Sequence, residues 1–184
     1  MGLREELERA AELAEPFAAP GESLAGVLPA EPGQGRRVYL CAFADVEGRR
    51  TWVALDGVGV PISSRAAVRE AVSIAALCEL AEETAAGGDL EELRAELVTL
   101  RLTESPPGIE EAEAAALALE RELGTPPRLA TPSYLDALGL ATRRLEQALG
   151  NGGGSPFAAA MAHGIATVEE LANEVEGRYK LELT

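Results

Sequence analysis

Residues 71–78 run for two helical turns without a charged side chain, in a chain where 26% of the residues are charged. The surrounding segment, 64–86, has the composition of a long helix, and on a helical wheel the uncharged run shows no polar face. A helix that is apolar on all sides must be covered on all sides. We therefore expect 64–86 to be a central, buried helix. The residues expected in the core are Val72, Ile74, Ala75, Leu77 and Cys78.

A segment with the period of β-strands precedes this helix. Residues 38–44 and 51–55 are rich in β-formers and Gly48 lies between them, which predicts a hairpin. The alternation over 58–62 allows a third short strand. Because the first strand is apolar on both faces, both faces require cover.

Amphipathic helices are expected on either side of these elements. One covers 2–15, and four more with near-heptad spacing begin close to residues 89, 109, 131 and 155. The segment 16–36 contains four prolines and four glycines, so we expect it to be a loop. The predicted fold class is α+β and helix-rich, with a small two- or three-stranded antiparallel sheet packed on a buried central helix and an amphipathic helical bundle.

The glycine-rich segment 151–154 predicts a hinge. We therefore expect a helix-rich α+β domain over 1–150, followed by a hinged C-terminal helix and tail over 151–184. The tail alternates beyond Gly177, which is a weak strand signal. The sequence leaves open whether this helix packs on its own chain or on a second copy.

The charge balance narrows the classes of partner. The formal net charge is −15, which disfavours nucleic acids and anionic membrane surfaces, because both are bound through clustered basic residues. A basic partner protein remains possible. Lys180 is the only lysine, and the preference for arginine and alanine is typical of a GC-rich bacterial genome. Cys41 and Cys78 lie in apolar runs and we find no leader or membrane span, so we expect a cytoplasmic protein with reduced thiols.

One stretch of the central helix carries a pattern of carboxylates. Residues 78–85 read CELAEETA, and at 100° per residue Glu79, Glu82 and Glu83 lie within one third of the helix circumference. Hard divalent cations prefer such oxygen ligands. The stretch resembles the end of the Nudix box, whose helix carboxylates hold magnesium against a diphosphate. Here Cys78 stands at the arginine of the box and Ala85 at its glycine.

These patterns support three hypotheses about function. The leading one is a non-catalytic cytoplasmic interaction or assembly module, expected to form a homodimer and to need no cofactor. The first alternative, implied by the resemblance, is a diverged Nudix-like hydrolase with Mg²⁺ held by Glu79, Glu82 and Glu83. The second is a small-ligand sensor. Its pocket residues would be Tyr39, Phe43 and Trp52, the aromatic side chains of the hairpin.

Overall fold

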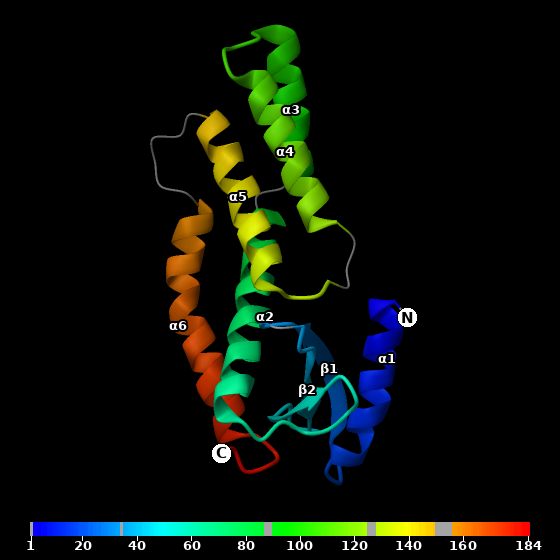
Figure 1. The fold of residues 1–184 in the computed structure, drawn as a ribbon. Coiled ribbons are helices and arrows are strands. Elements are labelled where there is room, and N and C mark those ends of the chain that lie inside the picture. Colours follow the sequence, from blue (N-terminus) through cyan, green and yellow to red (C-terminus); the bar gives the residue numbers. More distant parts are fainter. Residues whose placement is uncertain (1, 34, 87–89, 125–127, 150–155) are drawn as a thin grey trace. The chain divides into compact units, whose positions relative to one another are not determined.

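The computed structural model describes residues 2–33, 35–86, 90–124, 128–149 and 156–184, with the backbone alone at 84–86, 92 and 156–163. It confirms a helix-rich α+β fold with a three-stranded antiparallel sheet (Figure 1). The chain forms two compact units, each assembled from segments that are distant in sequence. The first unit is Met1–Ala76, Pro127–Pro132 and Ala166–Thr184, and the second is Leu77–Pro126 and Ser133–Ile165. This division differs from the expected boundary at residue 150, and the predicted hinge lies outside the described residues.

The helices and strands have the following bounds. The first unit contains α1 (Leu3–Ala14), a short 3₁₀ helix (Glu15–Phe17), β1 (Ser23–Ala30), β2 (Val38–Ala44) and β3 (Arg50–Asp56). The second unit contains α3 (Leu90–Thr103), α4 (Ile109–Leu123) and nearly all of α5 (Pro132–Leu149). Two helices, α2 (Arg65–Ala86) and α6 (Pro156–Gly177), contribute one half to each unit.

The sheet has the order β1–β2–β3, with β2 in the centre. The predicted hairpin is β2–β3, in which Cys41 pairs with Val53 and Tyr39 with Leu55. Side chains alternate between the faces of a strand, so these four residues share one face. That face forms a core with Ala10 and Ala14 of α1; the buried members of the core are Ala10, Ala14, Tyr39, Cys41, Phe43, Val53 and Leu55.

The opposite face of the sheet is covered as well. Leu40, Ala42, Trp52 and Ala54 alternate with the α1-facing residues, and all four are buried. Within the first unit, the start of α2 and the end of α6 also bury apolar stripes; their buried members are Val68, Ala71, Val72, Ala75, Val168, Ala172 and Val175. The sheet is therefore covered on both faces, as the two apolar faces of β2 require.

The segment 16–36 is not the loop that its composition predicts. It contains the 3₁₀ helix and β1, which pairs antiparallel with β2 from Ser23 to Ala30. Gly26 and Pro29 lower the strand propensity of this stretch, but β1 is an edge strand, where a proline costs no ladder hydrogen bond. The third strand of the sheet is therefore β1, before the hairpin.

Residues 58–62, the predicted third strand, form no strand; a tight turn follows β3, and Pro61 then makes one isolated antiparallel bridge with Leu55. The Asp56 side chain accepts hydrogen bonds from the amides of Val58 at 3.0 Å and Val60 at 2.8 Å. Gly59 has a φ of +87°, and a Cβ there would lie 2.8 Å from a methyl carbon of Leu13 on α1. The pattern of alternating valines comes from a turn that leaves both valines exposed.

The central helix α2 buries one stripe and leaves the rest partly covered. Val72, Ala75 and Cys78 are buried as predicted, whereas Ile74 and Leu77 are only partly buried. The prediction of burial on all sides was therefore wrong for the side of the helix that carries these two residues. The run shows no polar face on a helical wheel because its small residues are uncharged. The lack of charge does not require every side of the helix to be buried.

The C-terminal segment contacts its own chain. Residues around Tyr179 bridge to β3, with the Trp52 amide donating to the Arg178 carbonyl and the Lys180 amide donating to the Trp52 carbonyl. In the second unit, α6 lies so close to α2 that a Cβ on Gly164 would come within 1.9 Å of a Leu80 methyl carbon. The tail thus meets the sheet edge of the same molecule through one isolated bridge at Tyr179, and residues 178–184 do not form the strand that their alternation suggested.

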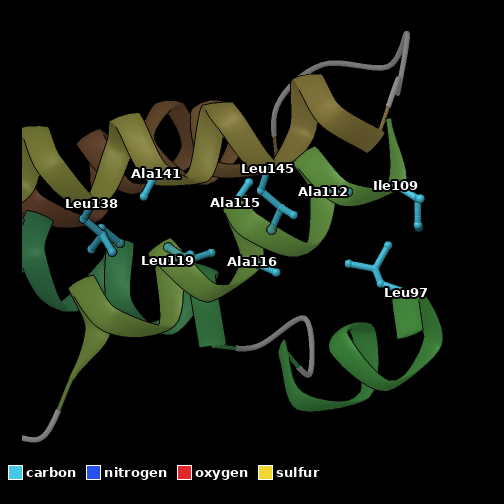
Figure 2. Packing of buried hydrophobic residues seen from close by; sticks show 10 residues of the cluster. Leu97, Ile109, Ala112, Ala115, Ala116, Leu119, Leu138, Ala141 and Leu145 are labelled. Atoms are coloured by element: carbon cyan, nitrogen blue, oxygen red, sulfur yellow. The ribbon is translucent and has the colours of Figure 1, made fainter. Parts of the chain in front are cut away.

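The second unit is a helical bundle with a core rich in alanine. Figure 2 shows side chains of α4 directed towards those of α5 and towards Leu97 of α3. The buried residues are Ala81, Leu97, Ile109, Ala112, Ala115, Ala116, Leu119, Leu138, Ala141 and Leu145. Because five of these ten are alanine, the helices pack with little side-chain volume between them.

Candidate functional site

The three aromatic residues predicted to line one pocket do not lie together. Tyr39 and Phe43 belong to the α1 face of the sheet, and Trp52, which pairs with Ala42, belongs to the opposite face. All three are buried, with exposed fractions of 6%, 0% and 3%. Phe43 and Trp52 are core residues, and only Tyr39 reaches the wall of a described cavity.

The three carboxylates of the predicted metal site lie on the part of α2 that belongs to the second unit. Glu79 and Glu83 are exposed, while Glu82 is partly buried and accepts a hydrogen bond from the Tyr134 hydroxyl. Loss of solvent around the carboxyl, together with the negative charges of Glu83 and Glu82, raises the pKa of Glu79. Among the described residues, no group of three or more His, Cys, Asp or Glu side chains is placed to hold a metal ion.

A cavity of about 290 Å³ opens in the first unit beside α1. Ala10 and Leu13 of α1 and Leu55 of β3 form its apolar wall, and Gly59 closes it next to Leu13. The remaining lining residues are Glu6, Arg9, Gly35, Arg37, Tyr39, Asp56 and Gly57. The turn after β3, which Asp56 holds in place, thus forms one side of the opening.

A network of charged and polar groups fixes the polar wall of this cavity. The Glu6 carboxylate forms an ion pair with Arg37 and accepts a hydrogen bond from the Tyr39 hydroxyl at 2.9 Å. The second carboxylate on Arg37 is Glu31, at 3.4 Å. The bonds from Arg37 and Tyr39 lower the pKa of Glu6, and burial followed by the charge of Glu6 raises the pKa of Tyr39. Arg37 is therefore held in position by partners on α1 and after β1.

A wider cavity of about 770 Å³ lies next to the first and shares Gly35, Arg37, Asp56 and Gly57 with it. Arg36 and Glu70 add one charge of each sign to its lining. The volume is within the range of small-molecule sites. The two cavities together give the first unit a groove of mixed charge along the end of the β2–β3 hairpin.

In the second unit, the helical hairpin of α3 and α4 presents a face with an apolar centre and charged ends. Arg94 on α3 forms an ion pair with Glu120 on α4, and Arg101 forms one with Glu113 at 3.2 Å. Between them, Val98 on α3 is 41% exposed and Leu117 on α4 is 36% exposed. We call this surface the α3–α4 face; it consists of Arg94, Val98, Arg101, Glu113, Ala114, Leu117 and Glu120, and it encloses a depression of about 260 Å³.

The sequence patterns identified neither the groove nor this face. Glu6, Arg37 and Tyr39 are separated by up to 33 residues, and only the folding of α1 onto the sheet brings them together. For the α3–α4 face, the spacing of the charged residues in the sequence does indicate which of them face each other. In an antiparallel helical hairpin the numbers of facing residues have a constant sum, and the pairs Arg94 with Glu120 and Arg101 with Glu113 have the same sum.

Comparison of the chain with protein-family models, with curated proteins and with solved structures found no match. In the described part of the chain, no helix combines the length and the apolar character that a membrane crossing needs.

Proposed function

We propose that the chain is a non-catalytic interaction module that acts by assembling into a homodimer. The observation that supports this proposal is the α3–α4 face. Val98 and Leu117 lie at its centre and Leu102, on the next turn of α3, is 76% exposed. Large apolar side chains that gather on one face are typical of protein interfaces, whereas single exposed ones are common everywhere.

The same surface bears on the choice between partners. The runs of glutamate on the helices would also suit a basic partner protein, as the net charge implies. The α3–α4 face itself, however, contains two arginines and two glutamates and has no net charge. A second copy of a chain with net charge −15 is repelled least at such a neutral surface. We therefore place self-association before a basic partner.

The cytoplasm is the compartment that we propose for this assembly. Cys41 and Cys78 are both buried, and neither forms a disulfide. Disulfides are rare in proteins of reducing compartments, where cysteine packs as a small apolar residue.

Sedimentation velocity over a series of protein concentrations tests the homodimer. We expect a dimer at micromolar concentration, and we expect Val98→Ser to shift the chain towards the monomer. Val46→Ser is the matched control, because Val46 is 94% exposed and lies in the turn between β2 and β3. A wild-type chain that stays monomeric up to millimolar concentration contradicts the proposal.

A second candidate function is the binding of a small carboxylate by the first unit. The cavity beside α1 favours it, because its lining combines an apolar wall with Arg9, for which the described residues provide no carboxylate partner. Hexanoate is a suitable probe, with hexanamide as its uncharged control. We expect hexanoate alone to raise the melting temperature, and Arg9→Gln to abolish the effect while Arg4→Gln, outside the cavity lining, retains it. Equal shifts with both probes would exclude recognition of the carboxylate.

A further inference from the structure

The residues of the α3–α4 face lie in three levels along the helical hairpin. Arg94 and Glu120 form the first level, Val98 and Leu117 the second, and Arg101 and Glu113 the third. The two helices run antiparallel, since a short turn joins the end of α3 to the start of α4. Each charged level therefore has its cation on α3 and its anion on α4.

This arrangement discriminates between the two ways in which a second copy can cover the face. A two-fold axis in the plane of the face can run either across the helices or along them. If it runs across them, α3 covers the partner's α3 and the first level covers the third. Arg94 then meets the partner's Arg101, and Glu120 meets the partner's Glu113. Like charges in contact are unfavourable, so the pattern opposes this dimer.

A two-fold axis along the helices has the opposite result. Each level then covers its own copy, and α3 covers the partner's α4. Arg94 meets the partner's Glu120, Arg101 meets the partner's Glu113, and Val98 meets the partner's Leu117. Each charged level becomes a square of four charges that alternate in sign. A guanidinium group has five N–H donors, so an arginine can keep the carboxylate of its own chain while it binds the second one.

We infer that the α3–α4 face is a self-complementary dimer interface in which α3 of one protomer packs on α4 of the other about an axis parallel to the helices. The inference rests on the homodimer proposed above and adds its surface, its orientation and the pattern of opposite charges that meet across it. The four helices would form an antiparallel bundle with an apolar seam of Val98 and Leu117 from both copies. Helices of about 14 residues are about 21 Å long. Such an interface is small, so the affinity expected is micromolar.

A charge-exchange experiment tests this interface. In an Arg94→Glu chain, the reversed charge would meet the partner's Glu120, and in a Glu120→Arg chain it would meet the partner's Arg94. Each variant alone should dimerise at least tenfold more weakly than the wild type. In an equimolar mixture, however, both contacts join opposite charges again. We expect the mixture to form a heterodimer whose affinity approaches that of the wild type, measured by sedimentation equilibrium.

Two controls distinguish the loss of specific charge pairs from unfolding and from a change in net charge. Glu96→Arg changes an exposed residue of α3 that does not line the α3–α4 face, and Arg143→Glu does the same on α5. Once their change in net charge is allowed for, both control variants should dimerise as strongly as the wild type. Circular dichroism and melting curves establish that each variant is folded before it is mixed.

The possible outcomes distinguish the interface from the proposed function. A dimeric wild type whose Arg94→Glu and Glu120→Arg variants also dimerise at full strength overturns this interface and leaves the homodimer intact. Two weakened variants that do not recover on mixing overturn the orientation, since the axis along the helices requires recovery. A wild type that is monomeric at every concentration overturns both.

Discussion

The ammonium group of Lys180 forms an ion pair with the Glu22 carboxylate and so joins the C-terminal tail to the residue before β1. The two residues are 158 positions apart, and both side chains are largely buried, with exposed fractions of 12% and 9%. The ammonium also lies 4.5 Å from the centroid of the Phe43 ring, at a distance suited to a cation–π contact. The only lysine of the sequence thus ties the last segment of the first unit to its first strand.

The first prediction concerns acid. The bond from Lys180, then those from the Thr51 hydroxyl and the Ala19 amide, lower the pKa of Glu22 from 4.5 to about 2. Because the folded pKa is the lower one, the ionised carboxylate stabilises the fold fully above about 4.5, and this contribution is lost as the pH falls towards 2. Glu22→Gln should lower the free energy of unfolding by about 1–3 kcal/mol at neutral pH.

Urea melts of both chains between neutral pH and pH 2 measure this difference. The gap between Glu22→Gln and the wild type should narrow as the pH falls through the titration range. Glu12→Gln, an exposed position on α1, is the control and should follow the wild type throughout. A gap of constant size at every pH would show that the substitution acts through packing.

The second prediction concerns Tyr179. Its hydroxyl accepts a hydrogen bond from the Ala54 amide at 3.0 Å and donates one to the Ile62 carbonyl at 2.6 Å. Tyr179→Phe keeps the ring and removes both bonds, so it should cost about 1–3 kcal/mol by leaving buried backbone groups without partners. Hydrogen exchange of the Ala54 amide reports the same change locally. Unaltered exchange at Ala54 in the variant would mean that another group replaces the hydroxyl.

The third prediction concerns thiol reactivity. Burial raises the pKa of Cys41 to about 12, so very little thiolate is present at neutral pH and no surface of the side chain is exposed. In a Cys78→Ala chain, where Cys41 is the remaining thiol, Ellman's reagent should label it only as fast as the chain unfolds. Labelling should therefore accelerate with urea. A rate in buffer close to that of free cysteine would show that the α1 face of the sheet opens to solvent.

The fourth prediction compares two leucines of α5. Leu138 is fully buried in the core of the second unit, and Leu140, two residues later, is 44% exposed. Leu138→Ala should lower the free energy of unfolding by about 2–5 kcal/mol. Leu140→Ala, which removes the same atoms from the same helix, should change it by less than about 0.5 kcal/mol. Equal losses in denaturant melts would contradict the assignment of the buried side of α5.

The periodic elements of the fold could be predicted from the sequence, and the contacts between distant segments could not. The hairpin and the helices follow from local spacing of apolar residues. The strand β1 was missed because Gly26 and Pro29 lower its propensity, while pairing with β2 determines its structure. The predicted pocket combined Tyr39 and Phe43 with Trp52 because all three are aromatic residues of the hairpin. Alternation within the β2–β3 register places Trp52 on the other face.

The candidate sites show the same division. Glu79, Glu82 and Glu83 were singled out because they are close in sequence, yet Glu82 is bound by Tyr134 from another helix. Glu6 and Arg37 were not singled out, because nothing in the sequence near either residue indicates their contact. Residues that are local in sequence are easy to group, and the groups that matter here are formed by tertiary packing.

The composition of the first unit has a consequence for synthesis on the ribosome. This unit begins at the N-terminus, but it also contains Pro127–Pro132 and Ala166–Thr184. The bonds from β3 to residues 178–180 and the pair between Lys180 and Glu22 require the last residues of the chain. The part of the molecule that emerges first is therefore completed last. Until the C-terminal segment has been synthesised, the edge of the nascent hairpin formed by β3 has no partner at Trp52. A chain ending at residue 150 would lack this closing segment. A change in its assembly would therefore first have to be separated from incomplete folding of the first unit.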